Sequence, residues 1–316
     1  MLPLPPHFIR NVTEAFPEGA EWLVELPNTL ASVAIRWSLT LGEAVPNLSF
    51  NYVCFATRAD GTPVILKVCV PNHEVRQEIA ALKFYKGRFA ARLLESDAEK
   101  GWLLLERIFP GTALSAMVET DDDAATRILG QMMQELWVPL PDSHPFLPLT
   151  AWAKAFSELR QRFDGKTGPF PESLIARAEA MFALPVTQPV LLHGDLHHDN
   201  VLKAERRVES GENTSPLSTL RCYVMIDPKS ITGERLADVG PIFYNPIEYI
   251  DHHPNLSAVT SRRVAILSEV LPAERDLTLE WGVAMTMLSA VWSIDDSTEG
   301  WRMTLRLAEL LSELKR

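Results

Sequence analysis

Cysteine is scarce in this chain, which has three in 316 residues: Cys54, Cys69 and Cys222. An odd number cannot pair completely, and each cysteine lies in an apolar segment with a strand-like pattern. A disulfide framework is therefore not expected to hold the fold together. We interpret the three side chains as reduced core residues of a cytoplasmic protein.

Long apolar runs are also missing. No segment approaches the roughly 18 consecutive apolar residues that a membrane-spanning helix needs. The first ten residues contain three prolines and lack the cationic and apolar regions of a secretory signal. We therefore expect a cytoplasmic protein that has no membrane partner.

Positive charge is in deficit, because 30 Lys and Arg residues stand against 41 Asp and Glu residues, for a net charge of −11. This field would repel the phosphates of nucleic acid, so nucleic acid is not an expected partner. A small polycationic molecule would be attracted. Many bacterial enzymes are acidic for solubility alone, so the charge supports such a partner without establishing it.

The length favours two lobes, because 316 residues are many for one hydrophobic core. Residues 1–108 open with helical patches and continue with strand-like segments and one further helix, whereas residues 109–316 are mostly of helical period. We expect an α+β chain with a β-rich N-terminal lobe and a mostly helical C-terminal lobe. A monomer or a weak homodimer is the expected state.

The chemically richest stretch is 190–202, which reads VLLHGDLHHDNVL. Apolar runs on each side predict two buried strands flanking a polar loop, a common place for catalytic groups. Asp195 and Asn200 stand five positions apart. This is the spacing of a kinase catalytic loop, in which the Asp accepts the substrate hydroxyl proton and the Asn holds a magnesium ion. A second apolar run ends in Asp227, which would suit the second metal-binding carboxylate.

The histidines of this loop allow another interpretation. His193, His197 and His198, with the carboxylates nearby, contain the ligand types of a zinc site, and the first two are spaced as on a metal-binding helix. Gly194 and the strand-like flanks argue against a helix there, and no cysteine lies close by. A polar loop without chemistry is the third possibility, and we prefer the magnesium interpretation.

The motif His-Gly-Asp-Leu-His-His-Asp-Asn at 193–200, followed by Ile-Asp-Pro at 226–228, resembles the Brenner-type motif of aminoglycoside phosphotransferases and related small-molecule kinases. The continuation through 246 resembles the branch that contains streptomycin 6-phosphotransferases and hydroxyurea-type resistance kinases. The motifs stand in a consistent order over roughly residues 50 to 250. The resemblance implies a bilobal protein-kinase-like fold that uses ATP and Mg²⁺.

A single charged residue, Lys67, interrupts the apolar strand predicted over 64–70. An Asp-Gly turn predicts that this strand forms a hairpin with a strand over 48–54. A buried lysine is costly unless it meets an anion. In a kinase that anion is the α/β-phosphate pair of the nucleotide.

The glutamate that orients such a lysine should lie on the next helix, predicted over 72–87 with Asn72 as its N-cap. Glu78 leads into the apolar face of this helix and is the expected partner of Lys67. Glu74, one turn earlier on nearly the same face, is the alternative.

Glycine is absent from 45–51, where a protein kinase carries its Gly-rich phosphate loop. By resemblance, the backbone of Ser49, Phe50 and Asn51 is the expected phosphate donor. A strand that runs into Pro-Gly at 110–111 marks the crossing to the second lobe. The expected adenine contacts there are the backbone groups of Glu106 and Ile108.

The acceptor pocket should be walled by the C-terminal helices, as the resemblance implies. An indole and two carboxylates come together at 292–296, and they would suit guanidino or amino groups of a cationic acceptor. Two further carboxylates follow the metal segment. With the loop residues, the candidate acceptor contacts are Asp195, His197, Glu248, Asp251, Trp292, Asp295 and Asp296.

Three structural expectations complete the sequence analysis. The polar segment 203–221 is predicted to be a long hairpin loop. Arg235 and Asp238 are candidates for an ion pair that steadies the metal segment. The three aspartates at 121–123 are expected to form a solvated helix start, because carboxylates favour the helix dipole there.

Together these features predict an ATP-dependent O-phosphotransferase for a small polar acceptor. The resemblance implies an aminoglycoside such as streptomycin as this acceptor, and its phosphorylation would confer antibiotic resistance. Hydroxyurea or another sugar or amino-alcohol metabolite stays open. A protein kinase is disfavoured because only ten residues lie between Asp227 and Asp238. A nucleotide-binding scaffold without turnover is disfavoured because Lys67, Asp195 and Asn200 are present as well.

Overall fold

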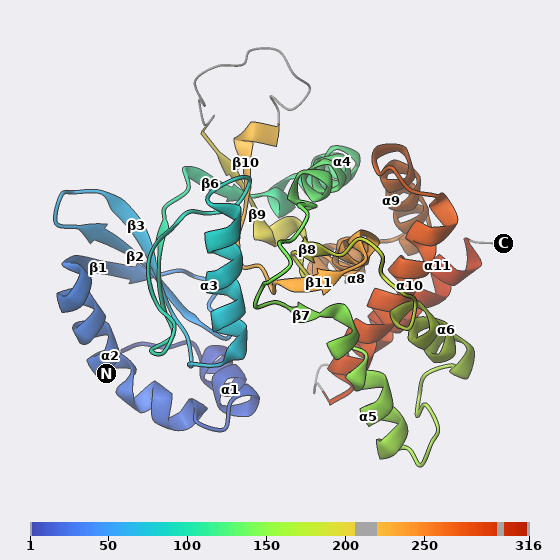
Figure 1. The fold of residues 1–316 in the computed structure, drawn as a ribbon, viewed down its shortest axis with the longest axis horizontal. Coiled ribbons are helices and arrows are strands. Elements are labelled where there is room, and N and C mark those ends of the chain that lie inside the picture. Colours follow the sequence, from blue (N-terminus) through green and yellow to red (C-terminus); the bar gives the residue numbers. More distant parts are fainter. Residues whose placement is uncertain (1, 206–219, 296–299, 315–316) are drawn as a thin grey trace. The chain divides into compact units, whose positions relative to one another are not determined.

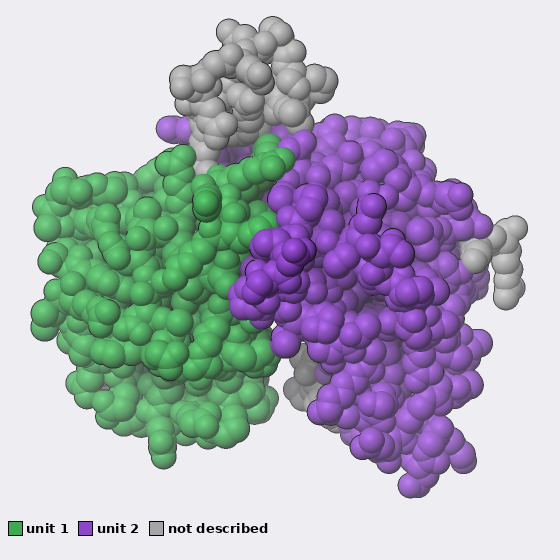
Figure 2. All heavy atoms as spheres, in the orientation of Figure 1, with its two compact units in different colours: residues 1–111 green, residues 112–316 purple. Residues whose placement is uncertain are grey.

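The computed structural model describes residues 2–205, 220–295 and 300–314. The chain forms two compact units, residues 1–111 and residues 112–316, which Figure 2 colours separately. The first unit is built on an antiparallel sheet, and the second is mainly helical with short strands. No helix within the described ranges has the length and hydropathy to cross a bilayer.

The sheet of the first unit has five antiparallel strands in the order β1-β2-β3-β5-β4. Three helices accompany it in the described part of this unit (Figure 1). In chain order the elements are α1 (Pro6–Ala15), α2 (Gly19–Trp37), β1 (Leu39–Ala44), β2 (Tyr52–Arg58), β3 (Pro63–Val68), α3 (His73–Tyr85), β4 (Leu93–Asp97) and β5 (Trp102–Glu106).

Residue alternation along β3 separates the two faces of this sheet. Val64, Leu66 and Val68 are buried in one apolar cluster together with residues of α1 and α2. The strand period of two therefore places Lys67 on the opposite face. Helix α3 contacts that face through Glu78, so the sheet has helices on both sides.

Helix α3 agrees with the helix predicted over 72–87. The side-chain oxygen of Asn72 accepts a hydrogen bond from the backbone N–H of Val75 at 3.0 Å, which makes Asn72 the N-cap. At the other end Lys86 and Gly87 have positive φ angles of 51° and 81°. This left-handed turn ends the helix.

The hairpin predicted at Asp60–Gly61 is present between β2 and β3. The Asp60 carboxylate accepts the N–H of Thr62 at 2.8 Å, and Gly61 has a φ of 85°. The strand predicted over 48–54 begins later than expected, because residues up to 51 form turns and bends. Strand β1 was not predicted at all, since its residues sit at the sheet edge and show little burial pattern.

The second unit is assembled from short strands and longer helices. Strand β6 (Pro110–Ala113) stands at its start. The helices are α4 (Val118–Leu136), α5 (Lys154–Arg162), α6 (Glu172–Phe182), α7 (Gly240–Tyr244), α8 (Ile247–Asp251), α9 (Leu256–Val270), α10 (Arg275–Trp292) and α11 (Trp301–Glu313). The other strands are β7 (Leu147–Pro148), β8 (Val190–Leu192), β9 (Val201–Ala204), β10 (Tyr223–Met225) and β11 (Ile231–Gly233).

These strands form two small sheets, with orders β10-β9-β6 and β7-β11-β8. The antiparallel pairing of β9 with β10 agrees with the hairpin predicted around 203–221. Most of the connecting loop, residues 206–219, lies outside the described residues. Strand β8 leads into the 193–200 motif, and β11 follows the 226–228 motif. Their pairing therefore brings together the two motifs predicted to carry the chemistry.

Helix α10 forms the centre of the second unit. Its side chains are buried on nearly every side from Thr278 to Val291, and it packs against α6, α7 and α11. A helix that is buried all round is typical of a protein interior. It continues into a short 3₁₀ turn, η7 (Ser293–Asp295), which completes the helical segment predicted from the sequence.

The aspartates at 121–123 do begin a helical segment, but they are not simply solvated. Asp121 has non-helical φ and ψ of −157° and 72° within α4, and its carboxylate accepts the N–H of Ala124. The two aspartates after it pair with Arg262 and Arg263 of α9. The expected solvation was wrong because these partners lie more than a hundred residues away in sequence.

Candidate functional site

The lysine of β3 and the glutamate of α3 form a buried ion pair. Lys67 Nζ lies 2.8 Å from both carboxylate oxygens of Glu78, and the two residues are 6% and 7% exposed. Glu74, the alternative partner, is exposed on α3. The first unit thus presents an oriented ammonium group on the face of its sheet that α3 covers. Such a group can neutralise phosphate oxygens.

The other residues predicted for the nucleotide lie at ends of the same sheet. Ser49, Phe50 and Asn51 form the turn that precedes β2, and the Phe50 ring is 46% exposed. Glu106 ends β5, where its carboxylate accepts the N–H of Arg92 at 2.7 Å. Ile108 is half-buried two residues later. Their roles toward a nucleotide stay predictions.

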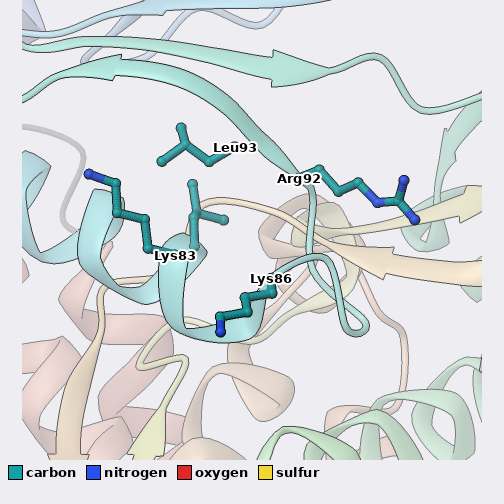
Figure 3. A pocket seen from close by; sticks show the side chains of 5 residues that line it. Lys83, Lys86, Arg92 and Leu93 are labelled. Atoms are coloured by element: carbon teal, nitrogen blue, oxygen red, sulfur yellow. The ribbon is translucent and has the colours of Figure 1, made fainter.

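A hollow of about 300 Å³ in the first unit lies at the end of α3 (Figure 3). Three cationic side chains and two leucines line it: Leu82, Lys83, Lys86, Arg92 and Leu93. In Figure 3 the three cationic ends point away from one another. They do not converge on a point, as the binding of one anion would require.

In the second unit, the loop 193–200 begins where β8 ends, and a buried carboxylate fixes its first turn. The N–H groups of His193 and Gly194 donate to the two oxygens of Asp238 at 3.0 and 2.7 Å. Asp238 belongs to the 3₁₀ turn η6 (Arg235–Val239) and is fully buried. Burial raises the pKa of this carboxyl to about 7, although the two N–H donors oppose the shift.

The ion pair predicted between Arg235 and Asp238 is therefore wrong. The guanidinium of Arg235 lies over the ring of Trp137, 5.5 Å from its centroid, and 4.0 Å from Glu234. Asp238 instead uses both oxygens on backbone N–H groups. Charge pattern in a sequence reveals carboxylate–guanidinium pairs but not a carboxylate that binds main chain.

The ring of His193 connects the two motif segments. Its Nδ1 accepts the N–H of Asp195 at 3.2 Å, so its Nε2 carries the proton and donates to the carbonyl of Ile226 at 2.9 Å. The backbone N–H of Lys229 also donates to the His193 carbonyl at 2.7 Å. Burial lowers the pKa of His193 to about 4, with Asp195 and Asp227 opposing the shift.

Asn200 is oriented by two contacts of its amide nitrogen. Nδ2 donates to the Asp195 carbonyl at 2.9 Å and lies 3.0 Å from Nε2 of His197. A carbonyl accepts only from the nitrogen of the amide, so the orientation of this side chain is fixed chemically. The Oδ1 atom is thereby left to coordinate a cation.

Asp227 stands two residues after the end of β10 in a left-handed conformation, with a φ of 62°. Aspartate is among the few non-glycine residues that adopt this region, and strained backbone often accompanies functional positions. The N–H of the preceding Ile226 donates to the carbonyl of Asn200 at 2.9 Å. The segments that carry Asn200 and Asp227 are thus adjacent.

This donor set suits magnesium better than zinc. Magnesium in nucleotide enzymes uses one or two carboxylates with phosphate oxygens, and one amide plus one carboxylate fit that pattern. Within the described ranges, no cluster of three or more His, Cys, Asp or Glu side chains could hold a metal ion. The zinc interpretation is therefore unsupported, and both nitrogens of His193 are already engaged.

His198, the third histidine of the loop, is a core residue. It is fully buried, and neither ring nitrogen has a hydrogen-bond partner among the described protein atoms. Burial, followed by the neighbouring Arg263, holds the pKa of His198 well below its usual value. Arg263 is itself fully buried, pairs with Asp122, and donates to the carbonyls of Ile242 and Asn245. The sequence analysis missed this arginine.

The predicted acceptor contacts lie in several places. The side chains of Asp195 and His197 are 33% and 14% exposed, and Nε2 of His197 lies 3.8 Å from Oδ1 of Asp195. Glu248 and Asp251 are exposed on α8, and Trp292 is 51% exposed at the end of α10. The side chain of Asp295 and the whole of Asp296 lie outside the described residues.

Two aromatic residues near Asp195 were missed as site residues. Trp152, expected as helix core, lies against Gly194. Tyr244 is hydrogen-bonded to Ser289, and its pKa is raised, chiefly by burial and then by the charge of Asp195. No pattern in the sequence marks either residue, since both segments read as ordinary apolar stretches.

Comparison with known proteins places this geometry in context. Residues 36–297 match the family described as aminoglycoside/hydroxyurea antibiotic resistance kinase. The chain is 30% identical to a streptomycin 6-kinase of Streptomyces griseus over 281 residues, which cover 88% of this chain and 86% of that protein.

Solved structures give the same fold. The choline kinase LicA from Streptococcus pneumoniae matches with a TM-score of 0.61 at 13% identity, covering 90% of this chain and 99% of that one. An aminoglycoside phosphotransferase from Streptomyces rimosus, in complex with ADP and streptomycin, matches with a TM-score of 0.50 at 18% identity, covering 82% and 97%. The predicted α+β, kinase-like fold is confirmed.

The buried ion pair of α3 makes a stability prediction. Glu78→Gln removes the charge that faces Lys67, and breaking a buried pair costs roughly 3–5 kcal/mol of unfolding free energy. Glu74→Gln, on the exposed side of the same helix, should change stability by less than about 0.5 kcal/mol. Urea unfolding of both variants measures the difference. Equal stabilities would contradict the importance of the pair.

His193 makes a pH prediction. Its pKa is about 4 in the folded protein, below the ordinary value of 6.5. Below pH 6.5 the unfolded chain therefore binds a proton that the folded chain does not, and stability is lost as pH falls. Between pH 6.5 and 5 the wild type should lose about 2 kcal/mol more than His193→Gln. Asp238 is present in both proteins, so its contribution cancels in the comparison. Unfolding free energies that change with pH in parallel in the two proteins would contradict the prediction.

Proposed function

The chain belongs to the aminoglycoside/hydroxyurea antibiotic resistance kinase family, which makes it a phosphotransferase with an alcohol group as acceptor, and we propose that this acceptor is streptomycin or a closely related cationic aminoglycoside. ATP is the phosphoryl donor in this proposal. The observation that best supports phosphotransfer is the arrangement of the 193–200 loop. There Asp195 is partly exposed, and Asn200 is turned to offer an oxygen.

Asp195 has the role of the base that orients the acceptor hydroxyl and takes its proton. The first turn of its loop is fixed by Asp238 and by the His193 ring, and both restrain main chain beside Asp195. Phosphoryl transfer has a loose transition state that demands little covalent help. Positioning of the hydroxyl is therefore the main contribution of this carboxylate.

Asn200 Oδ1 and the Asp227 carboxylate would hold Mg²⁺. When bound, this ion neutralises charge on the phosphate oxygens during transfer. The protein itself orients these two ligands. His197 and the Asp195 carbonyl hold the amide of Asn200, and Asp227 has a left-handed backbone conformation.

Lys67 would clamp the α- and β-phosphate oxygens of the nucleotide. Glu78 orients its ammonium group and offsets the charge of that group where it is buried. Ser49, Phe50 and Asn51 would contribute backbone groups to the phosphates. Glu106 and Ile108 would contribute backbone groups to the adenine.

Hydroxyurea is the second candidate acceptor, because the family to which the chain belongs includes resistance kinases for both compounds. The two acceptors differ in size and charge. Streptomycin carries guanidinium groups, which carboxylates and aromatic rings bind well, whereas hydroxyurea is small and neutral.

A panel of acceptors separates these candidates. The protein is mixed with Mg-ATP and with streptomycin, hydroxyurea or a neutral sugar, and the release of ADP is followed with each. We expect ADP release to depend on streptomycin. ADP release with hydroxyurea alone would identify hydroxyurea as the acceptor. No stimulation of ADP release by any compound would contradict both candidate acceptors.

Asp195→Asn tests the base. Removing a general base costs about 10²–10⁴-fold in turnover, so kcat should fall by that factor while the Kd of ATP stays nearly constant. Asp199→Asn is the matched control, since Asp199 is a more exposed carboxylate of the same loop. That variant should keep most of its turnover. Equal turnover in the Asp195 variant and the wild type would overturn the assignment.

A further inference from the structure

An aromatic pair stands beside the loop of Asp195 in the second unit. The rings of Trp152 and Trp292 meet edge to face, with centroids 5.3 Å apart and planes at 80°. Trp152 directly follows the 3₁₀ turn η2 (Leu149–Ala151), and Trp292 is the last residue of α10. Such pairs are stabilised by the ring quadrupoles, so each ring fixes the orientation of the other.

Trp152 reaches the catalytic loop itself. A Cβ atom built on Gly194 would lie 2.7 Å from Cη2 of Trp152, closer than any real side chain allows. Gly194 also has a φ of 79°, which other residues rarely adopt. The ring therefore packs directly on the backbone next to Asp195.

Helix α10 has a second connection to the same carboxylate. Ser289 and Trp292 are three residues apart and so lie on one face of the helix. Ser289 is hydrogen-bonded to the hydroxyl of Tyr244, whose phenol senses the charge of Asp195. One face of the last turn of α10 thus carries the partner of Tyr244 and the partner of Trp152.

The exposure of Trp292 is the feature that packing alone does not explain. At 51% exposed it is among the large apolar side chains most open to solvent, while the residue before it in α10 is buried. A half-exposed indole that packs against a second indole is suited to a delocalised cation. A guanidinium group stacks on such a face with less loss of hydration than an ammonium group.

We propose that Trp292, packed against Trp152, is the side chain that selects acceptors carrying a guanidinium group and holds them with their hydroxyl at Asp195. This inference rests on the proposed phosphotransfer to a cationic acceptor and names the chemistry by which that acceptor is recognised. Trp292 touches the acceptor. Trp152 is a positioning residue, which fixes the plane of Trp292 relative to Gly194.

Two substitutions of Trp292 separate the effect of its aromatic ring from the effect of its apolar volume. Trp292→Leu keeps an apolar side chain but removes the π face, and Trp292→Phe keeps an aromatic face. A cation–π contact of this kind corresponds to about a tenfold change in affinity. We expect Trp292→Leu to raise the KM for streptomycin about tenfold, with kcat and the KM for ATP nearly unchanged. Trp292→Phe should recover most of the loss.

Binding is measured alongside turnover, by calorimetric titration of streptomycin into each protein without nucleotide. The Kd should follow the KM across the three proteins. An equal Kd for streptomycin in the wild type and in Trp292→Leu would overturn the proposed role of Trp292, even if the wild type phosphorylates streptomycin. Tight binding that depends on Trp292 without ADP release would support that role and contradict the proposed function instead. No binding to the wild type would overturn the inference.

Trp152→Phe tests the positioning role. The smaller ring leaves Gly194 its space but changes the support of Trp292, so the KM for streptomycin should rise while hydroxyurea, if it is used at all, is unaffected. Unfolding midpoints of all variants are compared with that of the wild type. An identical rise in KM for streptomycin and for a neutral acceptor would show a general disturbance of the loop and contradict the selective role.

Discussion

The geometry of the site depends on one buried carboxylate that binds main chain. Asp238 accepts the N–H groups of His193 and Gly194 and so fixes the first turn of the loop, while the N–H of Lys229 holds the His193 carbonyl. A buried carboxylate without such donors would be costly. The interaction is therefore mutual: the donors offset the burial of Asp238, and Asp238 holds the backbone that presents Asp195. His193 then extends this order to Ile226, next to Asp227.

Much of this arrangement could be predicted from the sequence, because it follows from local rules. A lone lysine in an apolar strand, followed by a helix with a capping asparagine, was enough to pair Lys67 with Glu78. The strand period fixes the face of the sheet, and the apolar run after Glu78 favours that residue over Glu74, which lies one turn earlier on nearly the same face. The spacing of Asp195 and Asn200 works in the same way, since a short loop leaves few geometries for two polar side chains.

Other parts could not be predicted, for identifiable reasons. The partner of Asp238 is main chain, which carries no sequence signal. Arg263 and Asp122 lie on helices far apart in the chain, and each alone looks like a surface residue. Trp152 sits at a helical spacing that fits core packing, so its contact with Gly194 could not be read from the pattern. Strand β1 lies at the edge of the sheet, and its residues are at most partly buried.

Helix α10 combines a constrained interior with an unconstrained end. From Thr278 to Val291 nearly every side chain is packed, so any change of volume there leaves a cavity or a clash. Trp292 marks the point where that constraint stops. A substitution in this last turn can therefore change the surface beside the 193–200 loop while the packed body of the helix stays as it is.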